Sequence, residues 1–375
     1  MVIAVNTRFL IKNKLEGIGW FTYESLKRIT QSHPEHSFHF IFDREFDKEF
    51  VFSSNVTTHI IGPQARHPLL WYYWFEFSLP ALLKKINPDI FLSTDGYLSL
   101  KANSKQVLVI HDLAFEHTPE HIDPLSRFYY KYFTPRYARK AQRIATVSQF
   151  SKDDISSRYH IPPEKIDVVY NGANEFFHPA GNDEKEKVRK RYTQGMPYFI
   201  YAGAIQPRKN VDSLFKAFDQ FKEKYKTNHK LIIAGRFAWK TNEIKNVYAK
   251  MKHKQDVIFT GHLGRADLTS LIGASEAMVY ISLFEGFGIP IVEALQCEVP
   301  VITSNVSSMP EVAGKAGILV NPLDINSIAE AMHSVTSDIN LRQNSIAASK
   351  EQLKLFSWDL TAARLWQTIL SALKD

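Results

Sequence analysis

Two glutamates in the last third of the chain flank a glycine-containing loop whose residue types suit a phosphorylated carbohydrate. Glu285 lies in the loop and Glu293 follows eight residues later, in the segment EGFGIPIVE. Gly286 and Gly288 permit backbone conformations and close approaches that a side chain would block, and Pro290 suits a first helical turn. Backbone amides at a helix start can hold an anion, and carboxylates accept hydrogen bonds from hydroxyls. A nucleotide sugar carries both kinds of group.

Two adjacent cations, Arg208 and Lys209, could hold the phosphates. They follow an apolar run and the turn at Gly203, within the segment PRKN. Fixed cations can bind a diphosphate in place of a divalent metal. Such a pair is also common as a solvated surface patch, and Glu285 and Glu293 could be ordinary acids near the start of a helix. The site interpretation therefore depends on the context of these residues.

A histidine in the first half stands where ligands of parallel sheets bind. His111 and Asp112 end the apolar run 107–110. Because ligands bind beyond the carboxyl ends of parallel strands, His111 is a candidate sugar contact, and the alternative is a satisfied core histidine. His117, on the following loop, is a second candidate.

A short glycine turn precedes a helix-like stretch near the amino terminus. Gly17 and Gly19 follow the first apolar run and precede residues 20–29. Their backbone amides could approach a diphosphate, and the alternative is a plain strand-to-helix turn. No acidic residue at the spacing of dinucleotide-binding folds supports NAD.

The elements that must position these groups indicate two α/β domains. A chain of 375 residues exceeds what one core usually organises. Short continuous apolar runs alternate with amphipathic stretches, as is typical of buried parallel strands with crossover helices. The runs that predict strands are 2–5, 38–42, 90–93, 107–110, 144–147 and 166–169, then 198–201, 231–234, 257–260, 277–282, 299–303 and 317–320.

A cluster of proline, glycine and charged residues around 178–187 predicts the linker between the domains. We therefore expect an N-terminal domain over 1–180 and a C-terminal domain over 181–355. Residues 356–375 carry a helical apolar stripe and could pack back on the N-terminal domain.

Composition is that of a globular enzyme, with 45% hydrophobic and 23% charged residues. The single cysteine, Cys297, excludes an intrachain disulfide and a cysteine-based zinc site. The amino terminus does not resemble a signal peptide, and the apolar stretch 69–83 is interrupted by Glu76 and Pro80. These features favour a cytoplasmic protein without a membrane span.

The net charge of +7 and the pI near 9.1 favour an anionic partner. Lysine and arginine are spread along the chain and no nucleic-acid-binding motif is present, so no nucleic acid is expected. The aromatic stretches 71–75 and 127–133, with Lys84 and Lys85 nearby, leave two alternatives open. They could pack in the core under the acceptor side, or they could touch a membrane interface as a peripheral contact.

The C-terminal half resembles the nucleotide-binding half of family 4 glycosyltransferases. The landmarks that carry the resemblance are Ala202-Gly203, Pro207-Arg208-Lys209-Asn210, Ala234-Gly235, Thr260-Gly261, Glu285 to Glu293, Pro300-Val301-Ile302 and Pro310-Glu311-Val312. The N-terminal half is similar to the same family less densely. Gln206 and the segment Cys297-Glu298-Val299 depart from the family pattern without removing an expected ligand.

The resemblance implies an α/β fold of the GT-B type, with two Rossmann-like doubly wound domains facing a central cleft. The N-terminal domain would bind the acceptor and the C-terminal domain the nucleotide sugar. Arg208 and Lys209 would clamp the diphosphate, Glu285 and His111 would contact the sugar, and Glu293 would hold the ribose. The full implied donor-binding set is Gly17, Gly19, Gly203, Arg208, Lys209, Glu285, Gly286, Phe287, Gly288, Ile289 and Glu293.

The resemblance also implies a retaining, metal-independent transfer of a hexose, of mannose or glucose type, to a glycan or lipid-linked acceptor. The resemblance further implies a role in surface polysaccharide synthesis and no cofactor. It also implies a location in the cytoplasm or, as a peripheral protein, at the inner face of the membrane. Fold does not determine function, so three alternatives stay open. These are a sugar phosphorylase, an epimerase, and a non-catalytic nucleotide-sugar-binding protein.

Overall fold

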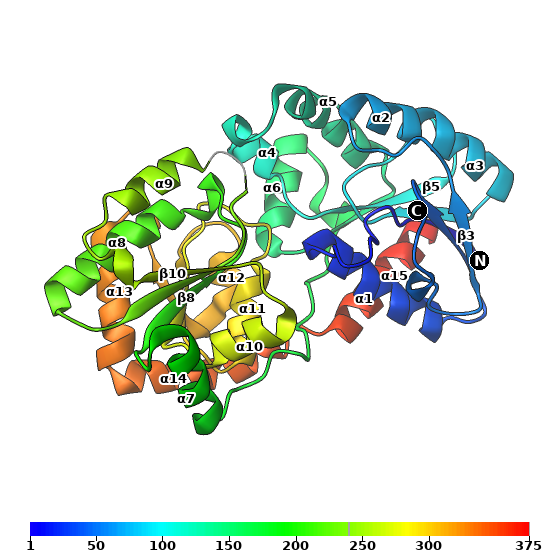
Figure 1. The fold of residues 1–375 in the computed structure, drawn as a ribbon. Helices are drawn as coiled ribbons and strands as arrows, with labels where there is room; N and C mark the ends of the chain where they lie inside the picture. Colours follow the sequence, from blue (N-terminus) through cyan, green and yellow to red (C-terminus); the bar gives the residue numbers. More distant parts are fainter. Residues whose placement is uncertain (239–240, 375) are drawn as a thin grey trace. The chain divides into compact units, whose positions relative to one another are not determined.

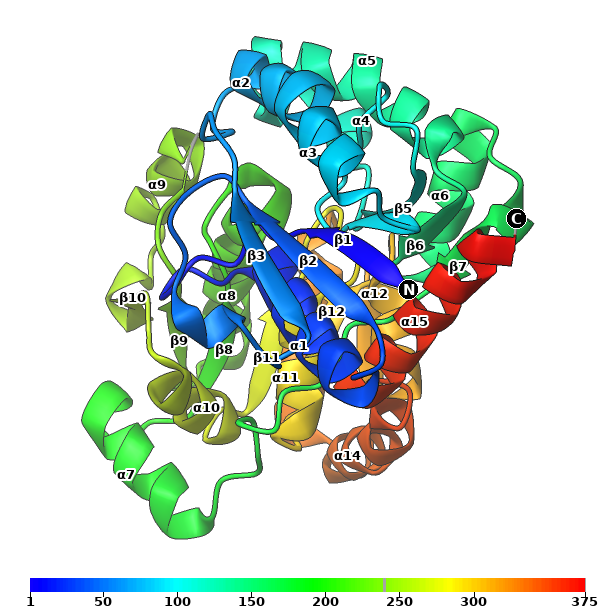
Figure 2. The ribbon, with the colours of Figure 1, turned by 90° about the vertical axis from the view of Figure 1, so that its right-hand side faces the viewer.

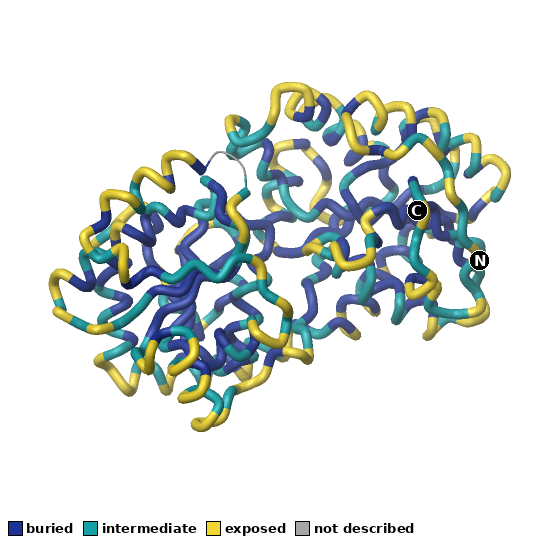
Figure 3. The backbone as a smooth tube through the Cα atoms, viewed as in Figure 1, coloured by how far each residue is buried: buried dark blue, intermediate teal, exposed yellow. Residues whose placement is uncertain are grey.

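The computed structural model describes residues 1–238 and 241–374, which form two compact units. Unit 1 comprises Met1–Gly172 and Ser357–Asp375, and unit 2 comprises Ala173–Phe356. Each unit is built around one parallel sheet covered by helices, with the central strands buried and the outer helix faces exposed (Figures 1 and 3). The prediction of an α/β fold with two Rossmann-like units is confirmed.

The sheet of unit 1 has seven parallel strands in the order β3-β2-β1-β4-β5-β6-β7. Its strands are β1 (Val2–Asn6), β2 (Ser37–Phe42), β3 (Val56–Ile60), β4 (Ile90–Ser93), β5 (Lys105–Ile110), β6 (Arg143–Thr146) and β7 (Ile166–Val168). Its α-helices are α1 (Gly17–Ser32), α2 (Pro68–Tyr73), α3 (Leu79–Ile86), α4 (Ala114–His117), α5 (Pro124–Lys140), α6 (Gln149–Tyr159) and α15 (Trp358–Lys374). A π-helical segment, η2 (Trp74–Ser78), joins α2 to α3.

The sheet of unit 2 has six parallel strands in the order β10-β9-β8-β11-β12-β13. Its strands are β8 (Tyr198–Ala202), β9 (Lys230–Ala234), β10 (Val257–Gly261), β11 (Ala277–Tyr280), β12 (Val301–Ser304) and β13 (Gly317–Val320). Its α-helices are α7 (Asn182–Thr193), α8 (Val211–Tyr225), α9 (Asn242–Ala249), α10 (Arg265–Gly273), α11 (Ile289–Gln296), α12 (Met309–Ala313), α13 (Ile325–Ser337) and α14 (Ile339–Leu353). The direction of winding reverses between β1 and β4 in unit 1 and between β8 and β11 in unit 2. Ligands of such sheets bind outside the strand ends at these reversals.

The sequence prediction omitted one strand, β3, at the edge of the first sheet (Figure 2). Its sequence VTTHI holds three polar residues, and none of its residues is fully buried. An edge strand that pairs on one side does not produce the continuous apolar run that identifies a central parallel strand.

The boundary between the units lies eight residues before the expected position, between Gly172 and Ala173. The segment 173–180 packs on unit 2, where the Asn174 amide donates to Gln296 Oε1 at 3.0 Å. The polar cluster expected to be a linker instead begins helix α7, with Asp183 and Glu184 in its first turn. Acidic residues stabilise the start of a helix through the helix dipole. The acids at 183 and 184 therefore indicated the first turn of a helix and not a loop.

Helix α15 lies in unit 1, where it packs on α1, β5 and β6 (Figure 1). Leu365 and Ile369 are buried in this contact, and Arg28 of α1 donates to Asp359 at 2.6 Å. No helix within residues 1–238 and 241–374 is long and apolar enough to cross a membrane.

Candidate functional site

The loops that follow β8 and β11 meet in unit 2 because these two strands are neighbours. Met278 of β11 pairs with Ile200 of β8, so both strands deliver their carboxyl ends to the same edge of the sheet. The loop after β8 carries Arg208 and Lys209, and the loop after β11 carries Glu285. A backbone hydrogen bond of 2.9 Å from the amide of Leu283 to the carbonyl of Arg208 joins the two loops directly.

Arg208, Lys209 and Glu285 form one buried ionic cluster. Arg208 Nη1 lies 2.9 Å from Glu285 Oε2, and Lys209 Nζ lies 2.6 Å from Glu285 Oε1. Tyr280, the last residue of β11, donates its hydroxyl proton to Glu285 Oε1 at 3.0 Å and accepts from Lys209 Nζ at 2.6 Å. Glu285 is 6% exposed. The structure thus brings together three residues that lie 76 and 77 positions apart in the sequence.

The ionic cluster stays charged and carries a net positive charge. Burial by itself raises the pKa of Glu285, but Arg208 and Lys209 outweigh it and bring the pKa down to about 2. One carboxylate and two cations give these three side chains a summed charge of +1. An anion that reaches this loop is therefore attracted to a preformed cationic group.

Asn210 fixes the turn that presents the two cations. Its backbone is left-handed, with φ of +58°, where asparagine is tolerated better than most residues. Its side-chain amide donates to the carbonyls of Ile281 at 3.1 Å and Pro322 at 2.7 Å. Asn210 was predicted only as part of a family landmark, and its contacts give it a positioning role. The sequence signal that could have indicated this role is an asparagine, which tolerates a left-handed backbone, directly after Pro207-Arg208-Lys209.

Two glycines allow the strand ends beside the cluster to approach. Gly203 has φ of +146°, and its amide donates to the carbonyl of Ala234 at 2.9 Å. A Cβ on Gly235 would lie 1.8 Å from the carbonyl oxygen of Gly203. No side chain fits at that distance, so Gly235 is required for this backbone contact.

The glycine loop leads into helix α11 as the sequence predicts. Gly288 has φ of +102° and lies at the N-cap of α11, with Ile289 as the first helical residue. Two serines that the sequence analysis missed hold the loop. Ser308 Oγ donates to the carbonyls of Glu285 at 2.9 Å and Phe287 at 3.0 Å, and Ser307 Oγ accepts from the amide of Glu285 at 3.1 Å. Serine is too common in loops for its type alone to have revealed these contacts.

Glu293 lies one turn into α11, partly buried. Burial raises its pKa from 4.5 to about 7, and the nearby positive charge of Arg265 lowers it only in part. Within residues 1–238 and 241–374 its carboxylate makes no hydrogen bond or ion pair. It is therefore a desolvated acceptor with unused hydrogen-bonding capacity, which a ligand hydroxyl could satisfy.

The remaining predicted site residues, His111, Gly17 and Gly19, lie in unit 1. His111 Nε2 lies 2.9 Å from the carbonyl of Thr94, so this nitrogen carries the proton and donates. The ring of Phe21 packs edge-on against the ring of His111, with 5.1 Å between their centroids. Burial lowers the pKa of His111 below its ordinary value, so the ring is neutral and its Nδ1 is an acceptor.

Asp112 and His117 take local roles beside His111. Asp112 Oδ1 accepts from the amide of Ala114 at 2.9 Å and so shapes the loop that follows β5. His117 Nε2 lies 2.7 Å from Asp154 Oδ2, and the same carboxylate pairs with Arg158.

Gly17 and Gly19 lie in the first turn of α1. The first amides of a helix have no partner within it. A Cβ on Gly19 would lie 3.0 Å from the carbonyl oxygen of Phe9, so a larger residue would push this turn apart. The N-cap residue, Glu16, makes no side-chain cap hydrogen bond to this turn.

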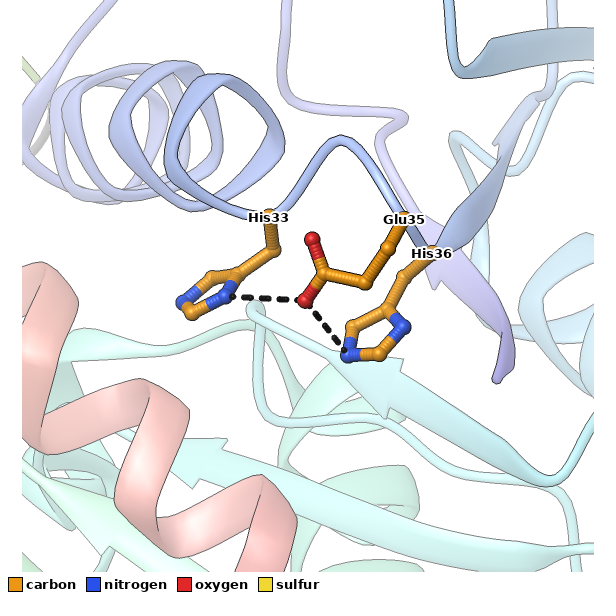
Figure 4. Close-up of side chains that lie close together, drawn as sticks. All are labelled: His33, Glu35 and His36. Atoms are coloured by element: carbon orange, nitrogen blue, oxygen red, sulfur yellow. Dashed lines mark ion pairs between the residues drawn. The ribbon is translucent and has the colours of Figure 1, made fainter.

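One group of three potential metal ligands occurs among residues 1–238 and 241–374, namely His33, Glu35 and His36 (Figure 4). His33 Nδ1 and His36 Nε2 lie 3.6 and 3.3 Å from Glu35 Oε1, and both rings stack on Trp366 of α15. The group connects α1 to β2, at the amino ends of the strands. His111 lies at the opposite edge of the same sheet, so this group adds no ligand to the predicted sugar site.

Comparison with known families assigns both halves of the chain. The family model described as Glycosyl transferases group 1 matches residues 182–352, and the model described as Glycosyltransferase Family 4 matches residues 16–175. The O-antigen chain mannosyltransferase B of Escherichia coli is 29% identical over 364 residues, covering 93% of this chain and 94% of that protein. The O-antigen chain mannosyltransferase RfbU of Salmonella typhimurium is 27% identical, covering 75% and 74%.

Solved structures share the architecture of the whole chain. A glycosyltransferase from Rickettsia africae has a TM-score of 0.74 at 17% identity, covering 100% of this chain and 99% of that one. WaaG, a glycosyltransferase involved in lipopolysaccharide biosynthesis, has a TM-score of 0.71 at 15% identity, and each chain is covered to 99%. Two Rossmann-like units with this likeness define a GT-B fold. The chain belongs to glycosyltransferase family 4.

Proposed function

We propose that the chain is a retaining, metal-independent mannosyltransferase that uses a nucleoside diphosphate sugar in surface polysaccharide synthesis. The observation that carries the proposed chemistry is the cluster of Arg208, Lys209 and Glu285 in the loops after the carboxyl ends of β8 and β11. The relatives named O-antigen chain mannosyltransferases support mannose and a glycan acceptor. A lipid-linked form of that acceptor is part of the proposal. A structural neighbour, HepE of Anabaena, is described in complex with UDP and glucose, which supports a nucleoside diphosphate donor.

The positive charge of the ionic cluster is suited to the leaving group. When the bond between the sugar C1 and the diphosphate breaks, negative charge develops on the phosphate oxygen. Arg208 and Lys209 supply two cations held in place by Glu285 and Tyr280, so no reorganisation is needed as that charge appears. Metal independence is proposed because these two cations can do what a divalent ion does for a diphosphate.

Retention of configuration is proposed to occur by front-face substitution. A double displacement needs a carboxylate that is free to attack C1. Glu285 is a poor candidate, since two cations and a tyrosine hydroxyl already engage its oxygens. In the proposed step, the acceptor oxygen bonds to C1 on the face from which the diphosphate leaves, and the departing phosphate oxygen takes the hydroxyl proton.

Further donor contacts are proposed for each unit taken separately, from Glu293 and helix α11 in unit 2 and from His111 and helix α1 in unit 1. Glu293 would accept hydrogen bonds from the ribose hydroxyls, because its carboxylate has no other partner among the described residues. His111 Nδ1 would accept from a sugar hydroxyl, because Nε2 already donates to Thr94. The amides at the starts of α1 and α11 would approach the phosphates.

The first experiment measures donor turnover and product stereochemistry. Nucleoside diphosphate mannose and glucose donors are compared in the presence of EDTA, and the anomeric configuration of the product is read by NMR. The proposal predicts turnover of the mannose donor with retention. An inverted product, loss of activity with EDTA, or a strict preference for glucose would each overturn the corresponding part.

The second experiment removes one cation from the cluster. Arg208→Gln should lower turnover by about a hundredfold or more, because it removes a preorganised contact to the developing anion. Lys216→Gln, an exposed lysine of α8 paired with Asp212, is the matched control and should stay at the wild-type level. Circular dichroism checks that both variants fold. Wild-type turnover in a folded Arg208→Gln protein would contradict the assignment.

A further inference from the structure

An unusual concentration of exposed apolar side chains lies on two neighbouring helical segments of unit 1. Eight of the nineteen exposed large apolar residues among residues 1–238 and 241–374 occur in α2, η2 and α5. They are Leu69, Leu70, Tyr72, Tyr73, Phe77, Leu125, Phe128 and Tyr132, and we call them, with Phe133, the aromatic face. Leu69 and Phe128 are 67% and 66% exposed. Scattered surface apolar residues are ordinary, but a concentrated group indicates a contact surface.

Ring contacts make the aromatic face continuous across the two segments. Tyr73 and Phe77 stack at 5.4 Å between centroids, and Tyr72 lies 5.8 Å from both Phe77 and Phe133. On α5, Phe133 contacts Tyr132 at 4.9 Å. Figures 1 and 2 both show α2 and α5 side by side.

Apart from Phe133, which packs against the core, the side chains of the aromatic face are left exposed by the fold of unit 1. The inner sides of η2 and α5 fill the core with Trp74, Phe75, Tyr129 and Tyr137, all of them buried. The outward side of a surface helix is normally polar. Some rings of the aromatic stretches therefore pack in the core, as one alternative expected, and others face solvent.

Basic residues outnumber acids around the aromatic face, where Asp123 at the N-cap of α5 is exposed and Glu116 pairs with Lys131 at 3.8 Å. The exposed basic residues on and beside it are Arg66, Lys84, Lys85, Lys101, Arg127, Lys131, Arg136 and Arg139. Lys101 Nζ lies 3.7 Å from the centre of the Phe77 ring, and the Arg136 guanidinium lies 3.5 Å from that of Tyr132. The one acid within α2, η2 and α3, Glu76, is buried and accepts from the amides of Leu100 and Lys101.

We propose that the aromatic face and its basic surround dock the protein on an anionic lipid surface. Tyrosine, phenylalanine and leucine side chains insert between lipid headgroups, while lysine and arginine beside them attract anionic lipids. A protein partner would not need this excess of one charge, and a nucleic acid would not need the leucines. Docking deepens the proposed function, because it would hold the enzyme beside a lipid-linked acceptor.

The test is co-sedimentation of the full chain with vesicles, without donor or acceptor. The protein should bind vesicles that contain phosphatidylglycerol, bind phosphatidylcholine vesicles weakly, and dissociate as salt rises. The double variant Leu69→Ser with Phe128→Ser should weaken binding about tenfold or more, because both side chains would otherwise insert. Lys84→Gln, Lys85→Gln and Arg127→Gln together should weaken it about a hundredfold.

A matched control comes from unit 2, where Leu323 and Ile339 are 72% and 68% exposed. Leu323→Ser with Ile339→Ser should bind vesicles like the wild type. Equal loss in the control, no binding to anionic vesicles, or a self-association or RNA contact that the face variants abolish while vesicle binding persists would overturn the proposal. Thermal melts and donor hydrolysis without lipid should match the wild type in the face variants. Vesicle binding without any sugar transfer would leave docking standing and would contradict the proposed function alone.

Discussion

Replacement of Glu293 by glutamine should make the ligand-free protein more stable while making it bind its donor less tightly. In the folded chain, burial raises the pKa of Glu293 from 4.5 to about 7. Glutamine has nearly the shape of the protonated acid and carries no charge. Because the carboxylate has no hydrogen-bond partner among the described residues, the substitution removes a desolvated charge without breaking a contact.

The magnitude follows from the two pKa values. An acid whose pKa is higher in the folded state binds more protons there, so its ionisation destabilises the fold as pH rises from 4.5 through 7. The full cost is present above pH 7. It amounts to about 3 kcal/mol, because each unit of difference between the folded and unfolded pKa corresponds to about 1.4 kcal/mol. The glutamine variant escapes this cost. Its advantage should be largest at pH 8 and mostly absent at pH 5.

Calorimetric melts of wild type and Glu293→Gln at pH 8 and pH 5 measure the effect. For a unit of this size, about 3 kcal/mol corresponds to a rise in the melting temperature of roughly 6–12 °C at pH 8. Donor affinity, measured by titration calorimetry at pH 8, should fall by about tenfold or more, since a hydrogen bond to a charged group is lost. Glu243→Gln, an exposed acid of α9 in the same unit, is the control and should change neither quantity.

Two results would refute this reasoning. If Glu293→Gln were less stable than the wild type at pH 8, the carboxylate would have a stabilising partner in the ligand-free fold. If the stability difference were the same at both pH values, the ionisation of Glu293 would not be its cause. If Glu293→Gln were more stable than the wild type but bound the donor equally tightly, Glu293 would not contact the nucleotide.

Two further substitutions test how the site is positioned. Asn210→Ala should cost about 2–3 kcal/mol in the free energy of unfolding, because it removes two buried hydrogen bonds and leaves alanine at a φ of +58°. Denaturant titration measures it, and Asn210→Gly, which relieves the backbone alone, should recover only part of the loss. Gly235→Ala should lower the melting temperature of unit 2 sharply, because its Cβ would overlap the carbonyl oxygen of Gly203 at 1.8 Å. Gly181→Ala, where a Cβ meets nothing within 4 Å, should melt near the wild type.

The central strands and the reaction class were predictable from the sequence because both leave local signals. Buried parallel strands are continuous apolar runs, and twelve of the thirteen strands found among residues 1–238 and 241–374 were predicted in this way. The exception, β3, pairs on one side at the sheet edge and keeps polar residues. The linker prediction was wrong for the related reason that acids and lysines around residue 184 occur equally in loops and in the first turns of helices.

The sequence by itself determined which residue types were available for chemistry, namely two glutamates beside a glycine loop, an adjacent arginine and lysine, and a histidine at a strand end. Only the tertiary structure decided that Arg208, Lys209 and Glu285 share one ionic cluster with Tyr280, and that burial raises the pKa of Glu293 to about 7. It also decided that part of an aromatic segment faces solvent. The charge state and the exposure of a side chain depend on which distant segments pack around it. The spacing of residues in the sequence does not specify that packing.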